Sequence, residues 1–287
     1  MSLLNRLSFS ALSLLVLSAT ACNSAGEKKA AGSSTDTTSK PAVMIKEEAV
    51  TYSADTVTMN GFVAYDSGST VKKPVVLIVH EWWGLNEYTK SRARQLAELG
   101  YLAMAIDMYG NGQQAENPEI AGKLATPFYA DPAMAKSRFD AALAYVKTLP
   151  AADTNQVAAI GYCFGGTQVL NMAKLGSPLR GVVSFHGGLA GVPADKKLLK
   201  AAILVCHGEA DSFVPAAEIT QFKKQMDSIG ADYSFKGYAN ATHAFTNPEA
   251  TDKGKKFKMP IEYNAAADSA SWNDMKAFFG KIFEKAN

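Results

Sequence analysis

The chain has 287 residues, of which 47% are hydrophobic and 20% are charged, with a formal net charge of +2. This length is sufficient for one large α/β domain with a buried core. A nearly neutral chain without a basic cluster has no electrostatic basis for binding nucleic acid, so we expect no such partner.

The N-terminus resembles an export signal. Arg6 precedes an apolar run over residues 7–17, and small residues lead from there to Cys22. An apolar run of this length is too short to span a bilayer and is typical of a signal peptide, which we expect over residues 1–21. Cys22 is either a chance cysteine near a cleavage site or the lipidated first residue of a bacterial lipoprotein. We favour lipidation, although Ala19 stands where that signal prefers leucine.

A polar segment follows the signal. Residues 22–49 are rich in small and polar side chains, and we expect them to form a flexible tether. Asn23 stands where inner-membrane lipoproteins typically carry aspartate. We therefore expect an outer-membrane lipoprotein of the bacterial cell envelope, facing the periplasm or the exterior. The lipid anchor would be its only contact with the membrane, and we expect a monomer.

The rest of the chain, residues 50–287, alternates between apolar strands and amphipathic helices. The turn pair Asn60-Gly61 predicts a hairpin over residues 56–66. Strands are predicted at 74–80, 101–107, 156–162, 181–186, 201–207 and 231–238. Helices are predicted at 88–100, 131–149 with Asp131 as its cap, 164–176, 215–229 and 264–285. This alternation predicts a single doubly wound α/β domain with a mostly parallel sheet that is covered on both faces.

One strand-to-helix junction has the spacing of a nucleophile elbow. Residues 161–166 read Gly-Tyr-Cys-Phe-Gly-Gly, which is the G-x-S-x-G pattern with Cys163 in the place of serine. Gly161 and Gly165 are needed there because larger side chains would collide in so sharp a turn. The alternative is an ordinary tight turn around a buried, inert thiol, since free cysteine is commonly a small core residue.

Two further residues complete a possible catalytic triad. Asp211 and His243 each follow a predicted strand, at the edge of the sheet where ligands bind. The order of nucleophile, acid and histidine along the chain is that of the α/β-hydrolase triad. Alone, Asp211 would be read as a turn carboxylate and His243 as a surface histidine. Their joint occurrence with Cys163 favours a triad.

The remaining cysteine and histidines are less distinctive. Cys206 lies within an apolar strand and is expected to be a packing residue. One strand separates it from the strand of Cys163, which puts the two thiols roughly 10 Å apart and beyond disulfide reach. Since no pair of histidines or cysteines has zinc-binding spacing, we expect no metal and no cofactor. Three histidines end strands and are expected at the rim of the pocket: His80, His186 and His207.

Taken together, these motifs resemble the dienelactone hydrolase family, whose members are α/β-hydrolases with cysteine nucleophiles. The resemblance extends over about residues 50–285. It is carried by the elbow at 161–166, HGEADSFVP at 207–215, THAF at 242–245 and HEWWG at 80–84. It implies an α/β-hydrolase fold and catalysis by Cys163, Asp211 and His243.

The resemblance also implies roles that spacing alone does not assign. Glu81 matches a glutamate that contacts the resting cysteine and takes part in its activation. Trp82 and Phe164 match the residues whose backbone N–H groups stabilise the oxyanion. The chain departs from the family where arginines hold a substrate carboxylate: Asn247 replaces one, and Lys123 is the available substitute for the other.

The resulting hypothesis is a hydrolase that cleaves a small ester or lactone through a thioester acyl-enzyme. Without the arginines, we expect neutral substrates to be preferred over anionic ones. The alternatives are a thioesterase or general carboxylesterase on the same site, a non-catalytic binding lipoprotein, and a redox thiol protein. Six aromatic residues are expected to form the wall of the pocket: Trp82, Trp83, Tyr109, Phe128, Tyr129 and Phe164.

Overall fold

The computed structural model describes residues 43–283. The predicted signal peptide, Cys22 and most of the predicted tether lie outside this range. The folded domain begins before the predicted boundary at residue 50, because the first strand starts at Ile45. The first half of this strand is polar and largely exposed at the edge of the sheet, so its sequence resembles that of a tether.

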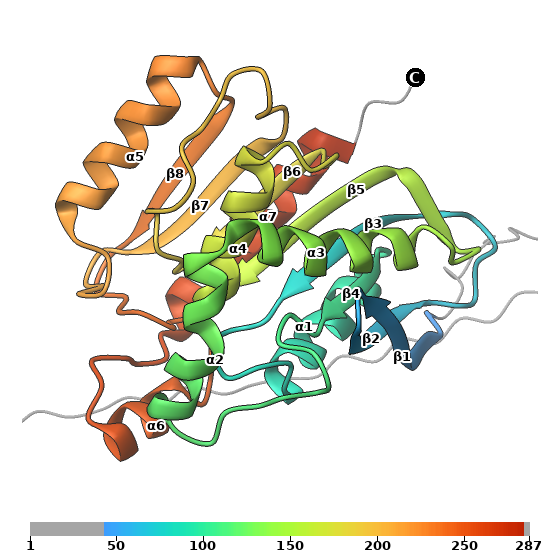
Figure 1. Ribbon diagram of the computed structural model, residues 1–287, viewed down its shortest axis with the longest axis horizontal. Coiled ribbons are helices and arrows are strands. Elements are labelled where there is room, and N and C mark those ends of the chain that lie inside the picture. The colour runs from blue at the N-terminus through green and yellow to red at the C-terminus, as the bar shows by residue number, and fades with distance from the viewer. Residues whose placement is uncertain (1–42, 284–287) are drawn as a thin grey trace, which may run out of the picture. The chain divides into compact units, whose positions relative to one another are not determined.

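Within the described residues, eight strands form one sheet in the order β1-β2-β4-β3-β5-β6-β7-β8 (Figure 1). The strands are β1 (Ile45–Ala54), β2 (Val57–Asp66), β3 (Lys73–Val79), β4 (Leu102–Ile106), β5 (Ala152–Tyr162), β6 (Gly181–Phe185), β7 (Ala202–Gly208) and β8 (Tyr233–Tyr238). β2 is antiparallel to both β1 and β4, and the other neighbouring strands are parallel. The predicted mostly parallel sheet is confirmed.

Helices cover both faces of this sheet, as predicted (Figure 1). They are α1 (Glu87–Glu98), α2 (Pro118–Ala130), α3 (Pro132–Val146), α4 (Phe164–Lys174), α5 (Ala216–Ile229), α6 (Ala250–Phe257) and α7 (Ala265–Phe283). Buried residues of α1 and α7 pack on one face, and buried residues of α2, α3, α4 and α5 pack on the other. Burial on both faces explains the nearly uninterrupted apolar sequences of the central strands. None of the described helices is long and apolar enough to cross a membrane.

Two predictions about local structure were wrong. The hairpin joins β1 to β2 at Asp55, whereas Asn60 and Gly61 lie inside β2 and pair with Thr51 and Val50. A glycine fits the interior of β2 because a Cβ there would lie 3.1 Å from the carbonyl oxygen of Ala105. The sequence analysis also missed α2 and α6, although the cap that Asp131 provides for α3 is present.

The fold brings the predicted functional residues to one edge of the sheet. β3, β5 and β7 are parallel, so the segments that follow them emerge at the same edge. Glu81, Cys163 and Asp211 lie in these segments, and His243 lies in the loop after β8.

Candidate active site

Cys163 occupies a sharp turn between β5 and α4, with φ 53° and ψ −114°. This left-handed conformation is strained for a residue with a side chain. The flanking glycines allow the turn to close: a Cβ on Gly161 would lie 2.0 Å from the carbonyl oxygen of Gly165, and one on Gly165 would lie 2.2 Å from that of Val79. The turn therefore has the geometry of a nucleophile elbow.

The side chains of Cys163, His243 and Asp211 form a hydrogen-bonded series. The Cys163 Sγ lies 3.0 Å from Nε2 of His243, and Nδ1 of His243 lies 2.8 Å from Oδ2 of Asp211. The Asp211 side chain is fully buried, and its other oxygen accepts the backbone N–H of Phe213 at 2.9 Å. The structure thus brings together the three residues of the predicted triad.

The electrostatics of this series favour a charged imidazole. Burial lowers the pKa of His243, but the Cys163 sulfur and the Asp211 carboxylate outweigh burial and raise that pKa to about 10. His243 therefore holds its proton beside the sulfur at neutral pH. A cation at this position stabilises a thiolate, which is the nucleophilic form of cysteine.

Glu81 lies in the loop after β3 and is only 2% exposed. Its Oε2 accepts a hydrogen bond of 2.6 Å from Nδ2 of Asn247, which stands where the family resemblance implies an arginine. No hydrogen bond joins Glu81 to Cys163 in the described part of the chain, although both side chains line one cavity. Burial raises the pKa of Glu81, and the hydrogen bond from Asn247 opposes this shift without cancelling it.

This pKa shift predicts the stability of a Glu81→Gln variant. Folded Glu81 binds its proton more tightly than unfolded Glu81, so the wild-type protein loses stability as pH rises from the ordinary glutamate pKa to the raised one. Glutamine cannot ionise and can still accept from Asn247. We expect the Tm of the variant to equal that of the wild type near pH 4, to exceed it increasingly as pH rises, and to level off above the raised pKa. Thermal melts between pH 4 and pH 9 measure this.

Glu119 provides the matched control, because its side chain is 78% exposed on α2. Glu119→Gln is expected to change Tm little at any pH. A Tm difference for Glu81→Gln that is the same at every pH would contradict a raised pKa for Glu81.

Two backbone N–H groups are candidates for an oxyanion site, since Phe164 follows Cys163 directly and Trp82 lines the same cavity as Cys163. Phe164 is the first residue of α4, so its N–H has no acceptor within the helix and lies at the positive end of the helix dipole. Trp82 follows Glu81 in a turn that is closed by a 3.2 Å hydrogen bond from the Gly84 N–H to the Glu81 carbonyl. Both residues stand where the family resemblance places the oxyanion donors.

A cavity of about 420 Å³ opens above Cys163 and His243. Its walls are mainly apolar, and no lysine or arginine of the described chain is among the residues that line it. The aromatic and larger aliphatic wall residues are Trp82, Trp83, Tyr129, Phe213, Val214, Met259 and Ile261.

The predicted aromatic wall is correct in part. Trp82, Trp83 and Tyr129 line the cavity, but Tyr109, Phe128 and Phe164 are buried behind it. These three rings pack on one another with centroids 5.4 to 5.7 Å apart, so they support the wall from within the core. Sequence analysis missed Phe213, whose ring contacts the His243 ring edge-on with centroids 5.0 Å apart. Its position two residues after Asp211 was the available signal.

Lys123 does not stand in for the missing arginines. It lies on α2, with a side chain that is 72% exposed and paired with Glu119 at 2.7 Å. α2 lines the cavity with Gly122, Ala125, Thr126 and Tyr129, whose spacing defines one face of the helix, and Lys123 is not among the lining residues.

The three strand-end histidines were expected at the rim of the pocket, and this expectation was wrong. Within residues 43–283, His80, His186 and His207 all lie outside the cavity lining and are at most 5% exposed. His80 contacts Met108 and His186 contacts Thr246, and a strand-end position alone does not reveal such distant contacts. His186 lies behind the nucleophile, where its Nδ1 accepts the backbone N–H of Cys163 at 3.1 Å.

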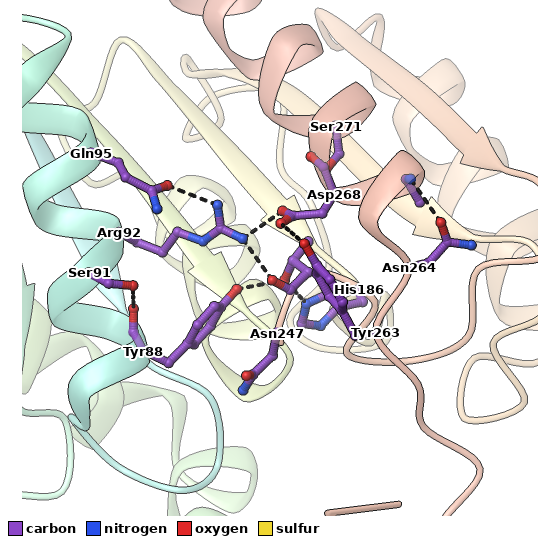
Figure 2. Close-up of polar contacts among 12 residues, drawn as sticks. Tyr88, Ser91, Arg92, Gln95, His186, Asn247, Tyr263, Asn264, Asp268 and Ser271 are labelled. Atoms are coloured by element: carbon purple, nitrogen blue, oxygen red, sulfur yellow. Dashed lines mark hydrogen bonds and ion pairs between the residues drawn. The ribbon is translucent and has the colours of Figure 1, made fainter. Parts of the chain in front are cut away.

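A polar network continues from His186 to α1 and α7 (Figure 2). Because Nδ1 of His186 is an acceptor, its Nε2–H donates to the Thr246 hydroxyl, at 2.7 Å. The Tyr88 hydroxyl also bonds this oxygen at 2.7 Å, and Arg92 donates to the Thr246 carbonyl at 2.7 Å and to Asp268 at 2.6 Å. Thr246 thereby links the loop of His243 to the elbow and to two helices.

Cys206 is separate from this site. β6 lies between β5 and β7, as predicted, and both Cys163 and Cys206 are free thiols. Cys206 is fully buried, and burial raises its pKa to about 12. Its thiol is therefore protonated at neutral pH, which agrees with a packing role. No cluster of metal-binding side chains is found among the described residues.

The relationship to known proteins agrees with this geometry. The model of the dienelactone hydrolase family matches residues 59–283. The chain belongs to the dienelactone hydrolase family.

Comparisons with individual relatives also support membership in this family. Protein usf from Aquifex pyrophilus is 31% identical over 212 residues, covering 72% of this chain and 87% of its own. A relative from Aquifex aeolicus, "Putative carboxymethylenebutenolidase", is 32% identical over 184 residues, covering 62% of this chain and 79% of its own. The crystal structure of a dienelactone hydrolase-like promiscuous phosphotriesterase from metagenomic libraries is similar with a TM-score of 0.77 and 32% identity. The match covers 83% of this chain and 98% of that one.

These relatives show that the chain is a hydrolase of this family with an α/β-hydrolase fold. The predicted fold class and family are confirmed. Membership in the family indicates a small-molecule ester or lactone as the substrate.

Proposed function

We propose that this member of the dienelactone hydrolase family hydrolyses small neutral esters or lactones with Cys163 as the nucleophile. The observation that carries the proposal is the hydrogen-bonded series from Cys163 through His243 to Asp211, which ends in an apolar cavity. A binding protein would have no need for this series.

The first half of the reaction forms an acyl-enzyme. The Cys163 thiolate attacks the carbonyl carbon, and the carbonyl oxygen becomes an oxyanion that the N–H groups of Trp82 and Phe164 stabilise. One such donor contributes about 3 kcal/mol to transition-state stabilisation. As the intermediate collapses, the bond to the leaving oxygen breaks and His243 gives that oxygen its Nε2 proton.

The second half releases the acid. Neutral His243 takes a proton from a water molecule, which attacks the thioester carbonyl, and collapse expels the Cys163 thiolate. Asp211 holds the imidazole in the orientation that both steps need and stabilises its charged form. Glu81 lines the same cavity, and in this proposal it takes part in activating the cysteine, as its counterpart in the family does.

The most direct test is to detect the acyl-enzyme. With p-nitrophenyl acetate, we expect a rapid burst of nitrophenol and an acetyl adduct on Cys163 that intact-mass and peptide analysis can locate. Prior treatment with iodoacetamide should remove both. Turnover that persists after Cys163 is fully alkylated would refute the proposal.

The cavity wall predicts the preferred substrate charge. A substrate carboxylate would lose water on entering a cavity lined by apolar groups and by Glu81 and Glu218, with no lysine or arginine of the described chain lining it. We expect kcat/KM for a neutral lactone to exceed that for its carboxylate-bearing analogue by at least about tenfold, which corresponds to about 1.4 kcal/mol.

Two lysines near the cavity serve as controls for this prediction. Lys123 is exposed on α2, and Lys253 of α6 lies over the Trp83 ring and pairs with Glu249. Lys123→Ala and Lys253→Ala should leave the preference for the neutral substrate unchanged. A wild-type preference for the anionic analogue would contradict this interpretation of the cavity, and its loss in either variant would identify the cation responsible.

A second candidate substrate class is the neutral phosphotriester. The relative of known structure that is 32% identical is described as a promiscuous phosphotriesterase. A triester carries no charge, so it suits a cavity that no lysine or arginine of the described chain lines, for the same reason that a neutral ester does. An aryl dialkyl phosphate assayed beside the aryl acetate, with and without iodoacetamide, distinguishes the two classes.

We also propose that Cys22 is lipidated and anchors the protein in the outer membrane. The supporting feature is the short apolar run that ends at Cys22 and is followed by a polar segment. Cys22→Ala is expected to move the protein from the membrane fraction to the soluble fraction. Failure of a palmitate analogue to label the wild-type protein in cells would rule out this anchor.

A further inference from the structure

His80 is a buried histidine that the mechanism above does not use. It follows β3 directly, is inaccessible to solvent, and lies beneath the loop that carries Glu81 and Trp82. Its ring stacks on that of Phe164 with centroids 5.7 Å apart and contacts Tyr109 edge-on at 4.7 Å. It therefore packs against the residue that supplies one oxyanion donor and precedes the loop that supplies the other.

The hydrogen bonds of His80 determine its tautomer. The backbone N–H of Met108 can only donate, and it lies 3.3 Å from Nε2, so Nε2 is the acceptor. Nδ1 must then carry the hydrogen, and it donates to the carbonyl oxygen of Glu81 at 2.5 Å. Burial lowers the pKa of His80 to about 4, so the ring stays in this neutral form at physiological pH.

This arrangement sets the orientation of one peptide group. The Glu81 carbonyl accepts from His80 Nδ1 and also from the Gly84 N–H at 3.2 Å. The carbonyl and the N–H of a planar trans peptide point in opposite directions, and the N–H of the Glu81 peptide group is that of Trp82. With the carbonyl directed toward the buried histidine, the Trp82 N–H is directed away from it.

We propose that His80 is a positioning residue that aims the Trp82 N–H at the oxyanion by holding the Glu81 carbonyl from behind. The inference rests on the proposed function, in which Trp82 donates to that oxyanion. Tyr109 adds a second restraint on the same loop, since its hydroxyl donates to the Trp82 carbonyl at 2.9 Å. The donor is thus held in place before substrate arrives, which is the condition for effective electrostatic stabilisation.

Two variants separate the two nitrogens of His80. The amide nitrogen of asparagine falls near the position of Nδ1, so His80→Asn keeps a donor for the Glu81 carbonyl and loses the acceptor for Met108. The amide of glutamine falls near Nε2, so His80→Gln keeps a partner for Met108 and loses the donor for Glu81. Both variants lose the ring, so the difference between them reports the bond to the Glu81 carbonyl.

We expect His80→Gln to lower kcat for p-nitrophenyl acetate by about 100-fold or more, the usual effect of losing an oxyanion donor, with KM little changed. His80→Asn should stay within about tenfold of the wild-type kcat, because an amide can still restrain the peptide. Alkylation of Cys163 by iodoacetamide forms no oxyanion, so its rate should be that of the wild type in both variants.

The outcomes are distinct. Equal kcat in the two variants, or a slower alkylation in proportion to kcat, would overturn the proposal, because either result indicates a general effect on packing or on the elbow. If His80→Gln does not fold, His80→Asn alone decides, and a 100-fold loss of its kcat would overturn the proposal. Full activity of a Cys163→Ala protein would instead refute the proposed function, independently of the His80 variants.

Discussion

Replacement of Cys163 by alanine is expected to abolish turnover of p-nitrophenyl acetate and to leave the fold intact. The substitution removes the sulfur that faces His243 at 3.0 Å, so no acyl-enzyme can form. The backbone strain at φ 53° is the same for any residue with a Cβ, and the smaller side chain introduces no clash. We expect a loss of kcat/KM of at least about 10⁴-fold, comparable to the removal of a nucleophile in other triads, and a Tm within a few degrees of the wild type.

The second described cysteine provides the matched control. Cys206→Ala removes a thiol from a fully buried position in β7, so it should lower stability by about 1 kcal/mol and leave turnover nearly unchanged. Activity assays and thermal melts on the two variants give opposite patterns if the assignment is correct. A folded but inactive Cys206→Ala protein would show that the wrong thiol had been chosen.

Gly161→Ala is expected to have the largest effect on stability. Its Cβ would lie 2.0 Å from the carbonyl oxygen of Gly165, which is a backbone atom of the elbow and cannot rotate away. Either the end of β5 or the start of α4 would have to move, and both segments are buried. We expect a loss of at least about 3 kcal/mol in the free energy of unfolding, measured by denaturant titration, or failure to accumulate as folded protein.

Gly122→Ala is the corresponding control. Gly122 lies inside α2, and a Cβ there would meet no atom within 4 Å. The substitution should stabilise the protein by up to about 1 kcal/mol, because alanine is the better helix former. If both variants were equally destabilised, the crowded elbow would not be the cause of the loss at Gly161.

Much of the candidate site could be predicted from the sequence because its residues lie at short fixed spacings or directly after strands. Gly161 and Gly165 flank Cys163 at a fixed spacing, and that spacing is dictated by a turn whose crowding depends on backbone geometry. Asp211 and His243 follow apolar strands, and parallel strands bring such positions to one edge of the sheet. The central strands β3, β4, β6 and β7 are recognisable from nearly continuous apolar runs.

Other features depend on contacts that a single sequence does not display. α6 contains Thr251, Asp252 and Gly254, and α2 contains Gly122 and Pro127, so local propensity disfavours both helices although the structure contains them. The polar start of β1 resembles a tether because only its later residues enter the core. His80 ends a strand as a rim residue would, but it contacts Met108, Tyr109 and Phe164, which follow other strands.

The ion pair between Arg92 and Asp268 has a consequence for how the domain unfolds. It joins α1 to α7 beneath the loop of His243, and Arg92 also holds that loop through the Thr246 carbonyl (Figure 2). Removal of one partner of a buried ion pair costs about 3 to 5 kcal/mol. Detachment of α7 would therefore leave the Arg92 guanidinium, which anchors the loop, without its Asp268 partner. We therefore expect the C-terminal helix and the loop of His243 to form one cooperative unit whose amide protons exchange together. A protease that trims this helix would also inactivate a site formed by residues it never reaches.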